Sequence, residues 1–295
     1  MEISIIIPNL HSPIIDQTIQ SILDQKTQYT YEIIIVGQDK YKLINQFINE
    51  KVQFFETVKP TPPGIARNIG VENSSGSYIF FIDSDCVASP HWVDLHMELH
   101  KQHQNPIVVG GGVAFSSDRY LELTDNIATF HENMVHIKQQ KKELLPSLNL
   151  SLPKNLWHQI GGFDPYYPYP AGEDAEFTTR IFLNCNCLYF IPQAFVFHKP
   201  NRQKFKDIFI HAFRFGMFSI KGNKKYQKQL KIPLLLKNKT LSIIFSPILS
   251  FYVIWKIMCY ERLPIKYWHT LPLIFILKII WCFGFAYAPN NSSRI

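Results

Sequence analysis

The fold is decided by the stretch Tyr78-Ile79-Phe80-Phe81-Ile82-Asp83-Ser84-Asp85. Its five apolar residues favour a buried strand, and two carboxylates follow directly at the strand end. In an α/β sheet, ligands bind at the carboxyl ends of the strands. Two carboxylates one residue apart repel each other unless a positive group lies beside them, and a divalent cation that holds a diphosphate meets this need. The alternative is a solvated turn in which Asp83 caps the next helix.

Short apolar runs alternate with helical patterns on both sides of this stretch. The alternation predicts an α/β fold with a mostly parallel sheet and helices on both faces. The other expected strands cover residues 2–7, 31–36, 52–55, 107–115, 147–151, 188–191 and 194–197. The expected helices cover residues 13–23, 41–47, 63–72, 90–103, 121–143, 154–160, 173–184 and 205–220.

Composition limits the class of protein. The chain has 295 residues, 46% of them apolar and 18% charged, which is typical of a packed globule with one large domain and an appendage, or two modest domains. The net charge of +7 suits an anionic partner such as a phosphate, a nucleotide or a lipid surface. No motif for reading a nucleic-acid groove is present, so no nucleic-acid partner is expected.

Two sequence features bear on the compartment. The five cysteines lack the spacing of a disulfide framework, so Cys185 and Cys187 are expected to be reduced packing residues. The amino terminus lacks the basic and apolar pattern of a signal peptide. We therefore expect the catalytic part of the chain to lie in the cytosol.

Six motifs together carry a family resemblance. In chain order they are Ile3-Ser4-Ile5-Ile6-Ile7-Pro8-Asn9, Glu32-Ile33-Ile34-Ile35-Val36 with Asp39, Gly64-Ile65-Ala66-Arg67-Asn68-Ile69-Gly70, Phe80-Phe81-Ile82-Asp83-Ser84-Asp85, Gly161-Gly162-Phe163-Asp164 and Gly172-Glu173-Asp174-Ala175-Glu176-Phe177. Each motif alone is weak, but six in this order form a specific pattern. The series resembles the family-2 inverting glycosyltransferases, which have the GT-A fold, a Rossmann-like nucleotide-diphospho-sugar transferase fold.

The resemblance implies a nucleotide-diphosphate sugar as donor. The nucleoside is expected over the ends of the first two strands, near Pro8, Asn9 and Asp39. The acidic, serine-rich stretch that is usual after the second strand is replaced here by Val36-Gly37-Gln38-Asp39-Lys40, so only Asp39 matches. The alternative is that Asp39 caps the helix that follows it.

The resemblance also assigns roles around the diphosphate. Arg67 is expected to pair with the diphosphate or to hold an acidic ligand, with a surface salt bridge as the alternative, and Asn68 to orient the loop. Asp83 is expected to contact the ribose or the sugar. Asp85 is expected to hold a divalent metal, Mn²⁺ or Mg²⁺, and His198 to add a further ligand unless it is only structural.

Glu173-Asp174 follows a loop rich in glycine and proline and begins a helix. An inverting transfer needs one general base that takes the proton of the acceptor hydroxyl. By resemblance Asp174 is this base, and Glu173 positions the acceptor or the loop. We expect the helix N-terminus to lower the pKa of the carboxylate. The alternative for this pair is plain helix capping.

Four histidines lie on the expected helix 90–103, and three of them, His96, His100 and His103, share one face. Their spacing suits zinc, but the other residues of the helix are polar. The preferred interpretation is a solvated face.

The last part of the chain changes character. Residues 240–255 and 271–288 are strongly apolar, and lysines precede them at positions 221, 224, 225, 228, 231, 237 and 239. We therefore expect a catalytic domain at 1–222 and a basic, apolar helical tail at 223–295 that associates with the membrane, as a peripheral or multi-pass protein on the cytoplasmic face. The alternative is a buried helical subdomain or an oligomer interface.

These observations lead to one expected function and two alternatives. The expected function is that of a metal-dependent inverting hexosyltransferase acting on a glycan or lipid-linked acceptor, in the synthesis of a surface polysaccharide, glycolipid or lipid-linked oligosaccharide. One alternative is a membrane scaffold that keeps the fold without turnover. The other is a metal-dependent nucleotide-sugar phosphohydrolase, which also uses paired aspartates.

Overall fold

The computed structural model describes residues 1–115, 119–223, 225–226, 229–230, 236 and 238–288. These residues form two compact units. The first unit consists of Met1–Ala114 and Asn133–Lys199, and the second of Phe115–Glu132 and Pro200–Ile295. The backbone therefore leaves the first unit at residue 115, returns at residue 133 and leaves again at residue 200.

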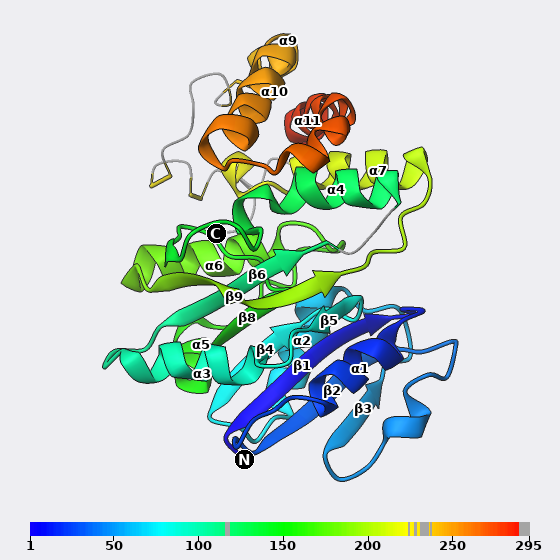
Figure 1. Ribbon diagram of the computed structural model, residues 1–295, viewed down its shortest axis with the longest axis vertical. Helices are drawn as coiled ribbons and strands as arrows, with labels where there is room; N and C mark the ends of the chain where they lie inside the picture. The colour runs from blue at the N-terminus through cyan, green and yellow to red at the C-terminus, as the bar shows by residue number, and fades with distance from the viewer. Residues whose placement is uncertain (116–118, 224, 227–228, 231–235, 237, 289–295) are drawn as a thin grey trace. The chain divides into compact units, whose positions relative to one another are not determined.

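A nine-stranded sheet forms the centre of the first unit (Figure 1). Its strands are β1 (Ile3–Leu10), β2 (Tyr31–Gln38), β3 (Val52–Glu56), β4 (Tyr78–Ile82), β5 (Cys86–Ala88), β6 (Val108–Ala114), β7 (Gln140–Lys141), β8 (Asn149–Pro153) and β9 (Leu188–His198). The spatial order is β3-β2-β1-β4-β8-β6-β9-β5, and β7 also pairs with β9.

The strand directions divide this sheet into two parts. Strands β3, β2, β1 and β4 are parallel to their neighbours, as the alternation of strands and helices predicts. Strand β8 runs antiparallel to both β4 and β6, so the sheet is mixed beyond β4. The carboxyl ends of β1, β2 and β4 consequently lie at one edge of the sheet, which is where the acidic pair follows β4.

Helices cover both faces of the sheet, as expected. The helices of the first unit are α1 (Ile15–Leu23), α2 (Pro63–Glu72), α3 (Trp92–Gln102), α5 (Lys154–Ile160) and α6 (Glu173–Cys185), with a 3₁₀ turn η1 (Asn45–Phe47). Ile5, Ile6 and Ile7 of β1 are all fully buried, and successive strand residues point to opposite faces. Gly70 of α2 lies against the Ile6 side chain, so α2 covers one of these faces.

The second unit is helical. Its elements are α4 (Tyr120–Phe130), η2 (His131–Asn133, which ends in the first unit), α7 (Phe205–Met217), η3 (Ile220–Gly222), α9 (Lys239–Ile244), α10 (Ser246–Trp255), the π-helical η4 (Lys256–Tyr260), η5 (Ile265–Thr270) and α11 (Leu271–Ala286). Helices α7 and α11 pack closely through two glycines. A Cβ atom on Gly216 would lie 2.0 Å from the Trp281 carbonyl oxygen, and one on Gly284 equally close to that of Phe213.

Three sequence expectations about local structure are wrong. The helix expected over 41–47 is only the 3₁₀ turn at Asn45–Phe47. The long helix expected over 121–143 ends at Phe130, because Gln140 and Lys141 pair with β9 instead. Cys185 and Cys187 are joined by a disulfide rather than separate. Helix α6 ends at Cys185, and Asn186 in the left-handed conformation turns the backbone so that the two cysteines meet.

The tail retains the expected apolar helices. Among the lysines that precede it, Lys224, Lys228, Lys231 and Lys237 lie outside the described residues. The expected boundary between residues 222 and 223 falls inside the second unit and stays a prediction about function.

Candidate active site

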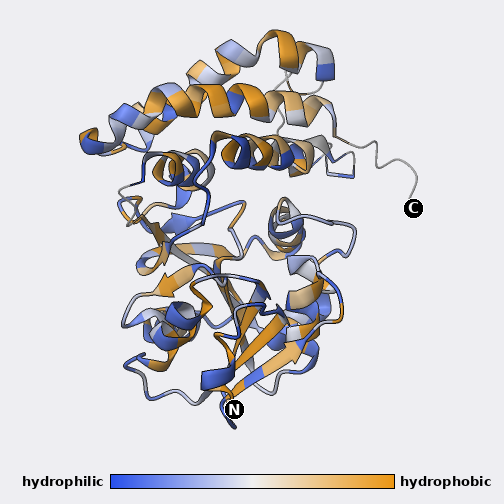
Figure 2. Cartoon of the chain, turned by 90° about the vertical axis from the view of Figure 1, so that its right-hand side faces the viewer, coloured by the Kyte–Doolittle hydropathy of each residue, from blue (hydrophilic) through white to orange (hydrophobic). Residues whose placement is uncertain are grey.

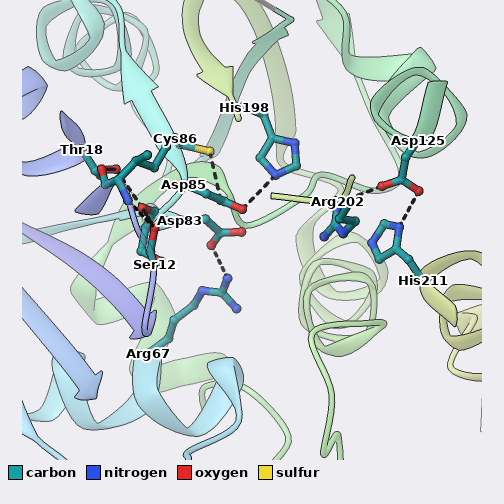
Figure 3. Close-up of polar contacts among 12 residues, drawn as sticks. Ser12, Thr18, Arg67, Asp83, Asp85, Cys86, Asp125, His198, Arg202 and His211 are labelled. Atoms are coloured by element: carbon teal, nitrogen blue, oxygen red, sulfur yellow. Dashed lines mark hydrogen bonds and ion pairs between the residues drawn. The ribbon is translucent and has the colours of Figure 1, made fainter. Parts of the chain in front are cut away.

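The acidic turn after β4 is held by hydroxyl groups from the first segment of the chain (Figure 3). Ser12 and Thr18 both donate to the carbonyl oxygen of Ser84, over 2.7 Å and 3.0 Å. The side chains of Asp83 and Asp85 remain about one-third exposed, at 31% and 29%. The backbone between the two carboxylates is therefore fixed, while the carboxylates themselves stay accessible to a ligand.

Arg67 of α2 connects this turn to the start of α6. Its Nη2 lies 2.6 Å from Asp83 Oδ1, and its Nη1 lies 3.0 Å from Glu173 Oε1. Only 2% of Arg67 is exposed, so the alternative of a surface salt bridge is wrong. A buried guanidinium requires anionic partners, and these two partners are 90 residues apart in the sequence.

Glu173 and Asp174 form the first turn of α6, as expected. Burial and the neighbouring Asp174 raise the pKa of Glu173 to about 7. Asp174 Oδ1 accepts from the Ala175 N–H at 2.7 Å, and its Oδ2 accepts from the Ser147 N–H at 3.3 Å. Burial nevertheless raises the pKa of Asp174, against the opposing effects of Arg67 and these N–H groups. The expected lowering of this pKa is therefore wrong, because desolvation outweighs the favourable helix N-terminus.

Asp85 and His198 meet where β5 pairs with β9. Cys86 lies opposite His198 in the antiparallel register, and the Lys199 N–H donates to the Asp85 carbonyl oxygen at 2.8 Å. His198 Nε2 lies 3.5 Å from Asp85 Oδ2. The strand pairing thus brings a residue from the end of β9 to the acidic turn.

This donor set fits a divalent cation that accepts both oxygen and nitrogen ligands. One ligand atom each from Asp85, Cys86 and His198 lies within 4.8 Å of the others. Burial raises the pKa of the Cys86 thiol well above its usual value, and a sulfur ligand suits Mg²⁺ or Mn²⁺ less well than oxygen or imidazole nitrogen does. Asp85 and His198 remain as the residues that would hold the ion, with coordination positions left for the ligand's own oxygens.

The residues expected to contact the nucleoside lie at the ends of β1 and β2. Pro8 is buried in β1. Asn9 donates to the Gln38 carbonyl oxygen and accepts from the Ser12 N–H. Since Ser12 also donates to the Ser84 carbonyl oxygen, it links this region to the acidic turn.

Asp39 follows β2 and organises its own loop. Its Oδ1 accepts from the Tyr41 N–H at 3.2 Å, and its Oδ2 accepts from the Ile44 N–H at 2.8 Å. Such bonds to the backbone of the following turn are expected if Asp39 acts as a cap, the alternative given by the sequence. Contact between Asp39 and a nucleobase stays a prediction.

The loop before α6 is held by two side chains. Asn68 donates to the Phe163 carbonyl oxygen at 2.8 Å and accepts from the Phe163 N–H at 2.9 Å. Arg180 donates to the carbonyl oxygens of Ile160 and Gly162. Asn68 thus contacts the loop as expected, whereas sequence reasoning missed the bonds of Arg180 to the loop. No sequence signal marks these bonds, because their acceptors are backbone carbonyl oxygens.

The histidine face of α3 is buried, so the expected solvated face is wrong. Ser151 Oγ lies 2.8 Å from both His96 Nδ1 and His100 Nε2, and Asn149 Oδ1 lies 3.0 Å from His96 Nε2. Burial lowers the pKa of His96 to about 4 and that of His100 to about 3, so both are neutral. The helix presents a polar face inward because β8 offers polar side chains there.

Comparison with known proteins identifies the family. The model of "Glycosyl transferase family 2" matches residues 4–163, more than half of the chain. Chondroitin synthase of Escherichia coli is 22% identical over 246 residues, which cover 70% of this chain and 36% of the relative. Hyaluronan synthase of Pasteurella multocida is 22% identical over 61% of this chain and 22% of the relative. Glycosyltransferase AglE of Haloferax volcanii is 25% identical over 60% of each chain.

Comparison with solved structures shows the fold. Two crystal structures of S. aureus TarS match 97% of this chain with a TM-score of 0.53 and 14% identity. The match covers 55% of the longer TarS chain and 90% of its 1–349 fragment. The chain thus spans only part of several relatives, about a third of the E. coli chondroitin synthase. The order of its strands, the acidic turn after β4 and the family match lead to one conclusion: this chain has the GT-A fold and belongs to glycosyl transferase family 2.

Proposed function

We propose that this chain is a metal-dependent inverting glycosyltransferase that moves a sugar, of the hexosyl type, from a nucleotide-diphosphate donor to a hydroxyl group of a glycan or glycolipid. The observation that carries the proposal is the double ion pair of Arg67. It holds Asp83 at the strand end and Glu173 at the helix start around one buried cation. Asp174 follows Glu173 directly, so the proposed base lies beside the proposed donor site.

The donor is proposed to bind along the strand ends. Asp39, with Pro8 and Asn9 nearby, faces the nucleoside, and Asp83 contacts the ribose or the sugar. Arg67 and Asn68 support this region through Asp83 and through the loop at Phe163. Asp85 and His198 would hold Mn²⁺ or Mg²⁺, which neutralises the charge of the departing nucleoside diphosphate when bound.

Asp174 is the proposed general base. Its carboxylate accepts the proton of the acceptor hydroxyl while that oxygen forms a bond to the anomeric carbon. The bond from the same carbon to the diphosphate breaks on the opposite face, so the configuration inverts. No second acid is required, because the diphosphate is already a good leaving group. Glu173 positions the acceptor side through its bond to Arg67.

The acceptor is proposed to be a glycan or a lipid-linked sugar, with a role in surface polysaccharide or lipid-linked oligosaccharide synthesis. Two relatives are named for chondroitin and hyaluronan synthesis, which supports a glycan product. We propose that the basic, apolar tail associates with the cytoplasmic face of a membrane. Among the described residues, one helix, Ile265–Ala286, is long and apolar enough to cross a membrane by length and composition.

The proposal is tested by thermal shift with a panel of uridine, guanosine and thymidine diphosphate sugars, each with Mn²⁺ and with EDTA. At least one donor should raise the melting temperature only when the metal is present, because ligands that bind the folded state stabilise it. Asp85→Asn should lose the metal-dependent part of the shift. Asp24→Asn, at an exposed position just after α1, is the control and should keep it. No stabilisation by any donor would refute the proposal.

A coupled assay separates the two alternatives. With a donor that binds, a phosphohydrolase would cleave the diphosphate with water and release nucleoside monophosphate and sugar phosphate, at the same rate with or without an acceptor glycan. A scaffold would bind the donor and release nothing. The proposed transferase should release nucleoside diphosphate faster when an acceptor is added.

A further inference from the structure

The helical segment α9–α10 exposes a row of large apolar side chains. Ile244, Ile248, Phe251 and Trp255 are 62%, 61%, 68% and 52% exposed. The helix continues through Phe245, which donates its N–H to Leu241 and accepts from the Leu249 N–H, both over 2.9 Å. Spacings of four, three and four residues place the four side chains on one face. We call this set the apolar row.

The opposite side of the same segment carries serines. Ser242, Ser246 and Ser250, spaced four residues apart, are at most 3% exposed. A helix of a water-soluble protein normally buries its apolar face and exposes its polar one. Here the small hydroxyl residues face the protein and the large apolar residues face outward. Such an arrangement indicates that the surroundings of the apolar row are apolar when the protein functions.

Charge identifies the surroundings. Residues 208–295 contain thirteen Lys and Arg residues and a single acidic residue, Glu261. The remaining 207 residues carry a net charge of −5, so the whole positive excess of the chain lies in this part. The exposed cations among the described residues of this part are Lys221, Lys225, Lys239, Arg262 and Lys266. A strongly basic segment with an outward apolar face is complementary to an anionic bilayer surface.

The packing of the second unit favours a helix that lies on the bilayer over one that crosses it. The apolar helix Ser246–Tyr260 is shorter than the roughly 20 residues that cross a hydrocarbon core. In α11, Lys278 is half-buried, and its Nζ donates to the Ala128 carbonyl oxygen of α4 at 2.6 Å. Helices α4 and α7 themselves carry Asp125 and His211, which bond each other at 2.8 Å (Figure 3). Helix α11 is therefore packed among partners that carry charged groups, unlike an independent span.

We propose that the apolar row inserts into the headgroup and upper acyl region of an anionic bilayer, with α9–α10 parallel to the membrane plane. Figure 2 shows the predominantly apolar colouring of these terminal helices. The inference deepens the membrane association proposed above by naming the face, the orientation and the lipid charge. It does not depend on the transfer reaction.

Co-sedimentation of the full chain with lipid vesicles, without any nucleotide, tests this inference. One set of vesicles is pure phosphatidylcholine, and the other contains about 30% phosphatidylglycerol, which gives the anionic surface. The chain should bind the anionic vesicles at least tenfold more strongly. The double variant Ile248→Glu/Phe251→Glu should lose at least tenfold of this binding, because it places charges in the apolar region.

The matched control is Ile48→Glu/Val58→Glu. These residues are 52% and 103% exposed, lie in the first unit and add the same charge. Control binding should stay near that of the unaltered chain. Equal losses of vesicle binding in both variants would show that the effect comes from net charge alone. No loss of binding in either variant would show that the apolar row does not contact the bilayer. Either result overturns the inference.

Two further results would also overturn it. Retention of the chain in membranes after extraction at alkaline pH would indicate a spanning helix. A vesicle-free dimer that Ile248→Glu/Phe251→Glu dissociates would indicate that a second copy of the chain covers the row. Because the assay omits donor and metal, its failure leaves the thermal-shift test of transfer untouched.

Discussion

Arg67 gives the clearest case of one residue that determines the arrangement of others. Its guanidinium is buried, as is its pair with Glu173, and its Nε has no hydrogen-bond partner among the described residues. The guanidinium therefore depends on Asp83 and Glu173 for compensation of its charge. Removing either partner leaves a buried charge uncompensated, which is far more costly than losing a surface pair.

Asp174→Asn tests the base directly. The amide is similar in size but does not accept the acceptor proton, so the turnover rate should fall by about 10²–10⁴. The donor-induced thermal shift should remain, because Asp174 is not proposed to bind the donor. Rates are measured by release of nucleoside diphosphate in the presence of acceptor. Unchanged turnover would remove Asp174 from the reaction.

The pH dependence of transfer follows from the pKa of the base. Only the ionised carboxylate accepts a proton, and burial raises the pKa of Asp174, so turnover should rise with pH above the range of an ordinary aspartate. Burial and the charge of Asp174 raise the pKa of Glu173 to about 7, so Glu173 is neutral at lower pH. Glu173→Gln keeps a neutral side chain at this position, so the acid limb set by Asp174 should stay in place and any further change of the rate near pH 7 should disappear. An acid limb that moves in this variant would assign the limb to Glu173.

Sequence reasoning finds the ion-pair residues but not their supports. Asp83, Arg67 and Glu173 are predictable because each lies in a short motif with a fixed place in the chain order. Arg180 bonds backbone carbonyl groups, which any sequence provides. Arg180 also pairs with Glu176, one turn earlier on α6, at 2.7 Å, and this pair is all that the local pattern predicts.

At the scale of elements, the loop between α5 and α6 is held from both sides. Asn68 bonds it from α2, and Arg180 bonds it from α6. The ring of Phe163 stacks on Phe177 with centroids 4.4 Å apart. The loop thus depends on specific bonds to keep its path into Glu173.

Arg180→Lys tests this bracing. A lysine has one amine and cannot reproduce the two guanidinium bonds to Ile160 and Gly162. We expect a rise of about tenfold in the acceptor KM, with the donor-induced thermal shift kept, and faster proteolysis within residues 161–172. Arg119→Lys is the control, since Arg119 is 63% exposed and lies in the second unit. Equal effects of both changes would contradict a specific role in the loop.

The polar contact between α3 and β8 predicts acid sensitivity. His96 and His100 have pKa values of about 4 and about 3 in the folded protein, below the ordinary 6.5. Between these values the unfolded chain binds protons that the folded chain does not, so stability falls as the pH drops below 6.5. At pH 5 the loss is about 2 kcal/mol for each histidine.

Urea unfolding at pH 7 and pH 5 measures this effect. All variants carry Glu173→Gln, because the raised pKa of Glu173 makes the folded state more stable as the pH falls and would mask part of the loss. His100→Leu should remove about half of the pH dependence. His91→Leu, at an exposed position just before the same helix, should leave it unchanged. If His100→Leu kept the full pH dependence of the free energy of unfolding, the acid sensitivity would come from other groups.

Helix and strand positions are predictable where periodicity is local, as in α2, α5 and α6. The expected helix 121–143 fails because residues 140–141 pair with β9, about 50 residues further along the chain. The prediction that the histidines of α3 are solvated is wrong for the same reason. Their partners Asn149 and Ser151 lie on β8, about 50 residues further along the chain. Local periodicity carries no information about distant partners.

At the scale of the whole molecule, each unit has its own ligand in the proposals above. Hydrogen exchange with mass spectrometry should show that a bound donor with Mn²⁺ protects the peptides around residues 83–85 and 173–198. Anionic vesicles should instead protect residues 240–260. Protection of residues 240–260 by the donor alone would contradict the separation of the two functions.

The mixed sheet is only partly foreseeable at this scale. The parallel order of the first four strands follows from short connections with helices. The antiparallel insertion of β8 does not, because it follows the excursion of the backbone through α4.

That excursion has a practical consequence for anyone who wishes to shorten the protein. Helix α4 is contributed from the middle of the sequence, yet it packs with the C-terminal helices through bonds such as that from Lys278 to Ala128. A truncated chain that ends at residue 199 keeps α4 and deletes its companions, and thereby leaves its apolar side uncovered. A soluble version of the catalytic part would need residues 115–132 replaced by a short polar bridge, in addition to the C-terminal deletion.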